Sequence, residues 1–201
     1  MENTKGSPWD VRYEREDYVF GKEPNVYFKE KISTLNPGKI LVPAAGEGRD
    51  AVYAAMLGWD VHAFDLSVVG KEKAFKLARE MKVEMVFDIL NISDFTYPEN
   101  TYNAVAMTYF HLSPLLRKIV YANIYKVLKP GGVLIIEAFN PEQLKNNSGG
   151  PKDETLLISK QILEQELQGL RAIECFEKDI ELSEGGGHVG KASVVRYFGV
   201  R

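Results

Sequence analysis

The sequence predicts an α/β fold, in which a mostly parallel sheet carries helices on both faces and ends in an antiparallel hairpin. Strand-like and helix-like segments alternate over most of the 201 residues, which is typical of parallel strands joined by crossover helices. An apolar run at residues 39–42 breaks into a turn of small residues, and a second apolar run ends on Asp65. Two runs of alternating polarity, residues 171–182 and 191–200, flank a glycine-rich stretch near the end of the chain.

The first half of the chain contains three predicted strands and two predicted helices. Residues 50–57 have helical spacing and are followed by Gly58, a residue type that commonly ends helices. Residues 68–81 also have helical spacing, with lysine and arginine on the outer face. The predicted strands around these helices are residues 39–42, 61–65 and 83–90.

Further along, a strand, a helix and another strand continue the alternation. The strand covers residues 102–109, and the helix is opened by Pro114 and runs to Leu128. The segment Lys129-Pro130-Gly131-Gly132 is expected to break the helix and to launch a fifth strand at residues 133–138. These segments complete the parallel part of the predicted sheet.

The pattern changes after the fifth strand. Residues 139–152 are predicted to form a long irregular loop, and loops of this length in compact domains are usually functional or disordered. Ser159 can cap a helix that ends at Gly169. Residues 183–190 join the two strands of the final hairpin, as a loop that we expect to come back over the sheet.

Composition indicates one soluble domain. A chain of this length with 45% hydrophobic residues can bury one sizeable core, so we expect a single domain over residues 1–201. Residues 1–35 would form a helical cap or lid ahead of the core at residues 36–201. The net charge of −3 leaves no broad basic face, so nucleic acid is not an expected partner. With polar residues 1–8 and no membrane-length apolar window, we expect a cytoplasmic protein without membrane contact, as a monomer or weak homodimer.

The turn after the first apolar run and the acid after the second one predict a nucleoside site. Small residues let the backbone approach a ligand, and an acid at this place accepts hydrogen bonds from both hydroxyls of a ribose. The glycines stop at Gly46 and Gly48, without the third glycine of a dinucleotide site or the Gly-Lys-Ser/Thr of a phosphate loop. A nucleoside without phosphates fits this turn, which points to S-adenosylmethionine. An ordinary tight strand–helix turn is the alternative.

The segment Leu128-Lys129-Pro130-Gly131-Gly132-Val133-Leu134-Ile135-Ile136-Glu137 resembles the stretch before the fifth strand of the class I S-adenosylmethionine-dependent methyltransferases. The resemblance spans residues 36–201 and implies a Rossmann-like sheet of seven strands, mostly parallel and closed by the antiparallel hairpin. Within the class, the chain resembles the small-molecule branch of tellurite-resistance-like or thiol methyltransferases. This second resemblance is carried by residues 9–13, 18–25, 110–112, 149–152 and 184–190. The chain departs from the family pattern at Val42, in place of an acid, and at Ala44, in place of a glycine.

The resemblance implies S-adenosylmethionine as cofactor and S-adenosylhomocysteine as product. Asp65 would bind the ribose, and Asn91 would meet the adenine amino group, with Asp88 as the alternative in a different register. Arg49 would pair with the cofactor carboxylate or an acceptor anion, or would form a solvated salt bridge. The expected cofactor-binding residues are Ala44, Ala45, Gly46, Gly48, Arg49, Asp65, Leu66, Asn91, Ile92 and Tyr109.

The methyl acceptor is expected to be a small molecule that carries a thiol, a chalcogen oxyanion or an amine. The resemblance places His111 beside the methyl donor, as a base or an orienting group; a histidine bonded to backbone in a turn is the alternative. His188, among the glycines of the hairpin loop, is expected to assist deprotonation of the acceptor. Tyr13 and Tyr18 are expected to reach the site from the lid. No metal site is expected, because three histidines and the lone Cys175 offer few ligands.

Two other functions stay open at this point. A protein that binds S-adenosylmethionine or its demethylated product without catalysis is compatible with the departures at Val42 and Ala44. A methyltransferase of proteins or nucleic acids is disfavoured by the acidic balance of the chain and by the lack of an Asn-Pro-Pro-Tyr-type base-flipping motif. Measuring turnover would separate the first alternative from an enzyme.

Overall fold

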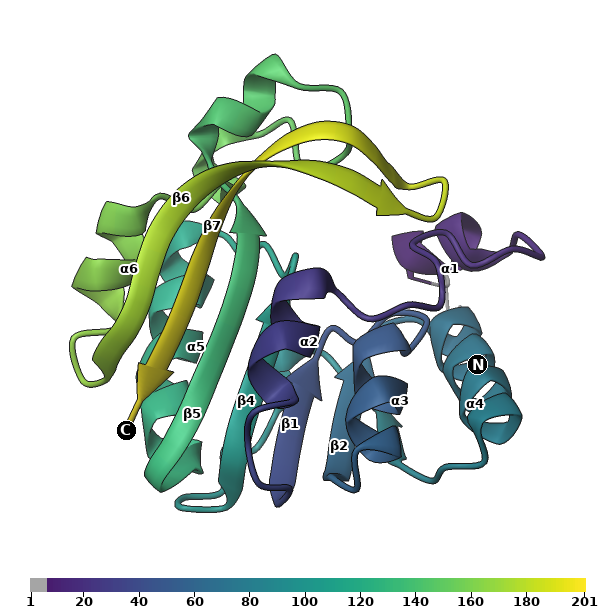
Figure 1. Cartoon of the computed structure of the whole chain (residues 1–201), viewed down its shortest axis with the longest axis horizontal. Coiled ribbons are helices and arrows are strands. Elements are labelled where there is room, and N and C mark those ends of the chain that lie inside the picture. The colour runs from purple at the N-terminus through teal and green to yellow at the C-terminus, as the bar shows by residue number, and fades with distance from the viewer. Residues whose placement is uncertain (1–6) are drawn as a thin grey trace, which may run out of the picture.

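A computed structural model describes residues 7–201 of the chain, which form a seven-stranded sheet with helices on both faces (Figure 1). The order of the strands across the sheet is β3-β2-β1-β4-β5-β7-β6. Strands β1 to β5 pair in parallel, and β7 runs antiparallel to both β5 and β6. The strands are β1 (Lys39–Pro43), β2 (Asp60–Asp65), β3 (Val86–Ile89), β4 (Tyr102–Thr108), β5 (Leu128–Phe139), β6 (Arg171–Glu184) and β7 (His188–Val200). The predicted fold class is confirmed.

The helices form two layers around the sheet. Helices α2, α3 and α4 cover one face and α5 and α6 the other, while α1 lies against α4 (Figure 1). The helices are α1 (Pro8–Tyr13), α2 (Val26–Ile32), α3 (Arg49–Met56), α4 (Val68–Met81), α5 (Pro114–Val127) and α6 (Lys160–Glu166). Short 3-10 turns are η1 (Ile92–Asp94), η2 (Pro141–Lys145) and η3 (Glu154–Leu156). The predicted helical cap contains α1 and α2, and its residues 1–6 lie outside the described part of the chain.

Strand β1 shows how the sequence builds a core on both faces of the sheet. Successive side chains of a strand point to opposite faces. Leu41 packs with Val120 and Ile124 of α5, whereas Ile40 packs with Ala51 of α3 on the other face. Because both faces are covered, the strand is a continuous apolar run rather than an alternating one.

The predicted helix at residues 68–81 agrees with α4 at both ends. The hydroxyl of Ser67 caps the start by accepting a hydrogen bond from the Gly70 amide. Lys82 ends the helix in the left-handed conformation, with φ of 58°. Helices α3 and α5 also agree with their predictions to within one residue at each end.

Two predicted boundaries in the sheet are wrong. Strand β3 begins at Val86 rather than Val83, because the Val83 amide donates to the carbonyl of Ala78 and so completes the end of α4. Strand β5 begins at Leu128, so the predicted breaker at residues 129–132 lies inside the strand. The register of β5 against β4 shifts at this place, as in a β-bulge, which accommodates the local preference for a turn.

The closing hairpin is longer than predicted and its turn is shorter. Strand β6 extends to Glu184 and β7 begins at His188, so residues 185–187 alone form the turn, not residues 183–190. The hairpin arches over the carboxyl ends of the parallel strands and reaches the N-terminal segment (Figure 1). There the Gly187 amide donates to the Val19 carbonyl over 2.7 Å. The tip of the hairpin and the N-terminal cap therefore meet above the sheet.

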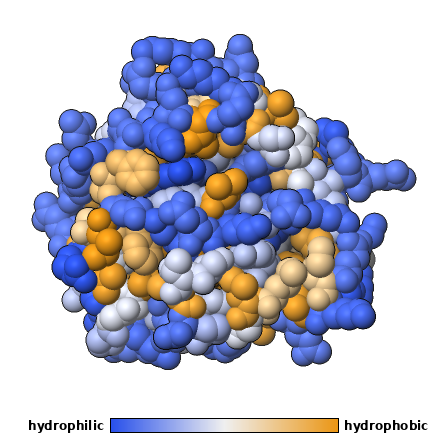
Figure 2. Space-filling view, viewed as in Figure 1, coloured by the Kyte–Doolittle hydropathy of each residue, from blue (hydrophilic) through white to orange (hydrophobic). Residues whose placement is uncertain are grey.

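The remaining irregular segment is also more ordered than predicted. Residues 139–152 begin at the end of β5 and then form η2, so the long loop is divided into short pieces. The face of the molecule in Figure 2 is mostly hydrophilic, with apolar groups scattered between charged side chains. Within residues 7–201, every helix is too short or too polar to cross a membrane.

Candidate active site

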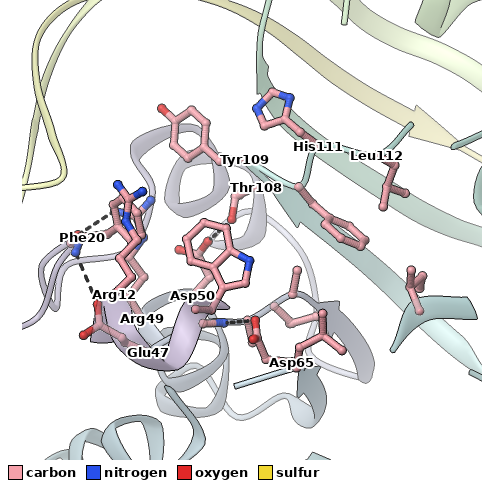
Figure 3. A pocket seen from close by; sticks show the side chains of 18 of the residues that line it. Arg12, Phe20, Glu47, Arg49, Asp50, Asp65, Thr108, Tyr109, His111 and Leu112 are labelled. Atoms are coloured by element: carbon pink, nitrogen blue, oxygen red, sulfur yellow. Dashed lines mark hydrogen bonds between the residues drawn. The ribbon is translucent and has the colours of Figure 1, made fainter. Parts of the chain in front are cut away.

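A cavity of about 590 Å³ lies at the carboxyl ends of β1, β2 and β4, below the hairpin tip and the N-terminal cap. Its volume is in the range of pockets that bind small molecules. Asp65 lies at one end of it, and Tyr109 and His111 lie toward the other (Figure 3). We use "aspartate end" for Asp65 with the loop at residues 44–49, and "histidine end" for Tyr109, His111 and His188. The predicted residues that line the cavity are Tyr13, Ala44, Ala45, Gly46, Arg49, Asp65, Leu66, Asn91, Ile92, Tyr109, His111 and His188.

The small-residue turn after β1 has an unusual backbone. Ala44, Gly46 and Gly48 have φ values of 51°, 55° and 88°, in the left-handed region that glycine adopts most easily. A Cβ on Gly46 would lie 2.8 Å from the hydroxyl of Tyr13, so the loop backbone comes close to the cavity wall. A Cβ on Gly48 would lie 2.5 Å from that of Ala74. Gly48 therefore permits close packing of α3 on α4 and, unlike the other predicted cofactor-binding residues, is not part of the cavity wall.

Asp65 is the last residue of β2 and is 7% exposed. Its two carboxylate oxygens accept hydrogen bonds from the Gly46 amide at 2.8 Å and the Ser67 amide at 2.9 Å. Burial raises the pKa of Asp65, and these backbone amides oppose that rise. Each carboxylate oxygen has a further lone pair, so the group can accept two more hydrogen bonds from a ligand.

Asn91 and Asp88 were the two candidates for contact with an adenine, and the structure separates them. Asn91 lines the cavity at the start of η1, where its Oδ1 accepts a hydrogen bond from the Ser93 amide. Asp88 lies on β3, and its carboxylate is 2.9 Å from Nε2 of His62, away from the cavity wall. Only Asn91 of this pair is placed to meet a ligand, so the role predicted for it stands as a prediction.

Arg49 is held by the protein itself. Its guanidinium donates to the carbonyl of Phe20 at 2.9 Å and to the carboxylate of Glu184 at 3.0 Å. Figure 3 shows the Arg49 side chain reaching toward the Phe20 backbone, whose amide also lies near the Glu47 carboxylate. The ion pair with Glu184 is largely buried, not solvated, with side-chain exposures of 11% and 10%. Arg49 therefore joins the loop after β1 to the hairpin tip.

Tyr13 lies at the aspartate end rather than beside the histidines. It is 5% exposed, and its ring stacks on Trp9 with centroids 5.6 Å apart. Burial and the charges of Asp65 and Glu47 raise the pKa of Tyr13, so its hydroxyl keeps its proton and is a hydrogen-bond donor. The prediction that Tyr18 reaches the site is wrong, because its hydroxyl donates to the Lys73 carbonyl outside the cavity.

His111 lines the cavity, but both nitrogens of its ring face backbone groups. Nδ1 is 2.9 Å from the Leu156 carbonyl, and Nε2 accepts from the Phe139 amide at 3.4 Å. Burial lowers the pKa of His111 to about 4. The ring is therefore neutral, and both of its nitrogens are engaged in hydrogen bonds. This agrees with the backbone-bonded alternative and contradicts a role as general base.

His188 is the first residue of β7 and is 5% exposed, so its predicted place in a loop is wrong. Aromatic rings surround it, with centroid distances of 4.4 Å to Phe20, 4.6 Å to Tyr109 and 5.3 Å to Phe139. Its Nδ1 lies 3.2 Å from the carboxylate of Glu184. Burial lowers the pKa of His188, and Glu184 opposes that shift. A neutral imidazole with one directed hydrogen bond faces the cavity here.

Comparison with known proteins identifies the fold and its chemistry. Residues 40–132 match the family described as a methyltransferase domain. This match agrees with the resemblance to the class I S-adenosylmethionine-dependent methyltransferases. Phosphoethanolamine N-methyltransferase 1 of Triticum aestivum is 28% identical over 160 residues, which cover 75% of this chain and 30% of the wheat protein. The chain thus spans less than a third of the length of that relative.

Two solved structures share this methyltransferase fold. TehB from Haemophilus influenzae has a TM-score of 0.72 and 16% identity, covering 89% of this chain and 62% of that chain. The 1,6-didemethyltoxoflavin-N1-methyltransferase of Burkholderia thailandensis, solved with 1,6-didemethyltoxoflavin and S-adenosylhomocysteine, has a TM-score of 0.64 and 17% identity. That likeness covers 88% of this chain and 78% of that chain. The predicted family is confirmed.

S-adenosylmethionine is the cofactor of this methyltransferase family, and the aspartate end fits its nucleoside. The Asp65 carboxylate has free lone pairs for two ribose hydroxyls, and Leu66 and Ile92 provide apolar walls beside it. A ligand in the cavity can come close to the loop backbone at Gly46, because glycine has no side chain in the way. No residue of the wall supplies the lysine of a phosphate loop, in agreement with a nucleoside that carries no phosphate.

A buried polar network lies behind the histidine end and was not predicted from the sequence. Glu137, 1% exposed, accepts hydrogen bonds from the Tyr109 hydroxyl at 2.7 Å, the Asn25 amide at 2.6 Å and Arg196 at 2.6 Å. Tyr109 has a left-handed backbone conformation, with φ of 50°, and its amide donates to the Glu137 carbonyl at 2.7 Å. Asp50 accepts from the Asn25 backbone and from Thr108 in the same region. The only signal in the sequence was polar residues inside apolar strands, which does not reveal their partners.

Proposed function

We propose that this protein transfers the methyl group of S-adenosylmethionine to a small molecule that carries a thiol, a chalcogen oxyanion or an amine. The observation that carries the proposal is that Asp65 and His188 line the same cavity at different ends. The cofactor supplies an electrophilic methyl group on a sulfonium. With its nucleoside at Asp65, the histidine end is left for the acceptor.

His188 is the proposed general base. Its Nδ1 faces Glu184, so Nε2 is the nitrogen available to an acceptor. Because burial holds the pKa of His188 below its ordinary value, the ring is neutral near pH 7 and can take a proton. Tyr13 would act as a hydrogen-bond donor beside the loop, and His111 would shape the wall through its backbone contacts.

Aromatic side chains support this chemistry by excluding water. Phe20, Tyr109 and Phe139 pack around His188, and Trp9 stacks on Tyr13 at the other side of the cavity. Aromatic faces stabilise a cation such as a sulfonium before the reaction. Holding donor and acceptor in line in a dry site provides much of the rate of such a displacement.

The charges at the cavity favour an anionic acceptor over a protonated amine. Arg12 lines the cavity with its guanidinium 5.1 Å from the Phe20 ring centre, and it makes no ion pair with a carboxylate of residues 7–201. The carboxylates of the wall are engaged or distant: Glu47 pairs with Lys73, and Asp50 accepts two hydrogen bonds. A thiolate or chalcogen oxyanion would be attracted to the cavity wall at Arg12, whereas an ammonium group would not.

An amine acceptor is the second candidate, because the wheat relative and the Burkholderia protein are both named N-methyltransferases. A protein that binds the cofactor without catalysis is the third, since Val42 and Ala44 replace residues of the family pattern at the cavity wall. With a net charge of −3, we propose a free small molecule as substrate rather than nucleic acid or a membrane.

The proposal is tested by release of S-adenosylhomocysteine with a panel of thiols, selenite, tellurite and amines of similar size. We expect turnover that is faster with acceptors anionic at the assay pH than with protonated amines. Calorimetric titration with S-adenosylmethionine, NAD and ATP accompanies the assay, because the loop after β1 favours the first ligand. Tight binding without product from any acceptor would point to the non-catalytic alternative.

A further inference from the structure

His188 has a defined tautomer in this structure. Its Nδ1 lies 3.2 Å from Oε2 of Glu184, and an ionised carboxylate can only accept a hydrogen bond. The proton therefore sits on Nδ1, and Nε2 carries the lone pair. Within residues 7–201, Nε2 has no hydrogen-bond partner and is not one of the fully buried polar atoms that lack one. Nε2 is therefore accessible, and the ring lines the cavity.

Glu184 is itself held in place. Arg49 donates to its Oε2 at 3.0 Å, and the side-chain amide of Asn25 donates to its Oε1 at 3.4 Å. Burial disfavours the charged form, but the hydrogen bond from His188 and the charge of Arg49 hold the pKa of Glu184 below its ordinary value. Glu184 is thus an anion at neutral pH and accepts the Nδ1 hydrogen bond without taking the proton.

A glycine lets the chain pass close to the Cδ2–Nε2 edge of the His188 ring. Gly149 has φ of 122°, and a Cβ on it would lie 2.6 Å from Cδ2 and 3.2 Å from Nε2 of His188. The chain passes this edge of the ring without placing a side chain on it. The carboxylate at Nδ1 leaves Nε2 as the nitrogen that can face the cavity, and the glycine at position 149 places no side chain against it.

We propose that Glu184 is a positioning residue for methyl transfer, which holds His188 as a neutral base with Nε2 toward the acceptor and stabilises the imidazolium that forms. The inference rests on the proposed function. The nucleophilic atom of the acceptor bonds to the methyl carbon, while the bond from that carbon to sulfur breaks and its electron pair stays on sulfur. His188 Nε2 takes the proton of the acceptor, and the Nδ1 proton remains in the hydrogen bond to Glu184.

The charges around His188 predict the direction of a pH effect. The groups that face it are Glu184 on β6, Arg49 on α3, Arg12 on α1, and Tyr109 and His111 after β4. Burial and the two arginines lower the pKa of His188, and Glu184 raises it. Loss of the Glu184 charge should therefore lower this pKa further. The acidic limb of the pH–rate profile, where His188 becomes protonated, should then move to lower pH.

The test compares Glu184→Gln with Glu181→Gln. Glu181 is a matched control, because it lies on the same strand, is exposed and has no side-chain partner within residues 7–201. Nitrogen-15 NMR of the imidazole rings is practical, since the chain has three histidines. We expect the Nδ1–H tautomer in wild type and Glu181→Gln. In Glu184→Gln we expect mixed tautomers, a lower pKa of His188, and kcat lower by roughly ten-fold to a thousand-fold, with cofactor affinity nearly unchanged.

Two results would overturn the inference. One is a wild-type ring protonated on Nε2, which needs no variant and so decides the case even if Glu184→Gln fails to fold. The other is a folded Glu184→Gln protein with the tautomer, pKa and pH–rate limb of wild type. Failure of the proposed function would give a different result. The tautomer and pKa of His188 would still depend on Glu184 in the NMR spectra, yet no acceptor would yield S-adenosylhomocysteine.

Discussion

The two ends of the cavity are built from very different stretches of chain. At the aspartate end, the hydrogen bond from Gly46 to Asp65 joins residues 19 positions apart, within one strand–loop–helix–strand unit. At the histidine end, the contact of Asn25 with Glu184 joins residues 159 positions apart. This second end collects segments from the N-terminal cap, the ends of β4 and β5, and the hairpin tip.

The difference shows which part of the site the local fold determines. The geometry of two parallel strands and a crossover helix is sufficient to place a small-residue loop beside an acid. The histidine end exists only when the hairpin folds back over the sheet and meets residues 19–21. Changes at the hairpin tip that keep the Arg49–Glu184 ion pair can therefore alter the acceptor site while the cofactor site stays as it is.

The largest expected effect is at the histidine end. His188→Ala should lower the rate of methyl transfer by about ten-fold to ten-thousand-fold, because general bases contribute on that scale. Cofactor affinity should hardly change, since the ring lies away from Asp65. The loss should shrink for thiols of lower pKa, because an acceptor that is already an anion needs no base. Single-turnover rates over a thiol series measure both effects, and wild-type rates across the series would remove His188 from the mechanism.

The aspartate end should respond in the opposite way. Asp65→Ala should weaken binding of S-adenosylmethionine by about 2 to 4 kcal/mol, the scale of losing charge-assisted hydrogen bonds to two hydroxyls. Melting without ligand should fall, because the Gly46 and Ser67 amides lose their acceptor, and the stabilisation on adding cofactor should largely vanish. Asp65→Asn keeps one acceptor oxygen and is the matched control. It should lose less affinity for S-adenosylmethionine than Asp65→Ala. Unchanged calorimetric affinity in Asp65→Ala would mean that β2 does not end at the ribose.

The sequence was informative where local pattern decides structure. The apolar run of β1, the acid that ends β2 and the limits of α4 were predicted correctly. The sequence was less informative where pairing between distant segments determines the limits of a strand or a turn. Alternating polarity does not show where a turn starts, so Glu184 and His188 were placed in a loop although they pair across the hairpin. Likewise, the pairing of Leu128 with Tyr102 overrides the helix-breaking residues that follow it.

The contact between the hairpin tip and the cap gives a third test of the comparison. A Cβ on Gly187 would lie 2.6 Å from the Phe20 ring and 2.9 Å from the Val19 side chain. Gly187→Ala should therefore destabilise the fold by about 1 to 3 kcal/mol, the usual cost of overpacking. It should also raise KM for the acceptor with little change in cofactor affinity. Gly186→Ala is the control, since the nearest atom to a Cβ on Gly186 would be Nη2 of Arg15, 3.8 Å away. Equal melting temperatures of the two variants would contradict tight packing at the contact between Gly187 and the cap.

The smallest expected effect separates the two histidines of the cavity by their role. Burial lowers the pKa of His111 from 6.5 to about 4, so the unfolded chain binds this proton more readily than the folded one. The stability that His111 contributes is therefore complete above about pH 6.5 and is lost as the pH falls toward 4. Between pH 7 and pH 5 the loss should be about 2 kcal/mol.

Denaturant unfolding at the two pH values measures this loss, and His111→Asn provides the comparison. Burial of His188 acts in the same direction, so the difference between wild type and variant isolates the part due to His111. The variant should lose less stability than wild type on acidification. Its acidic limb of the pH–rate profile should stay in place, because His111 does not exchange a proton with the acceptor. A shift of that limb in His111→Asn would return this residue to the chemistry and weaken the contrast between the two histidines.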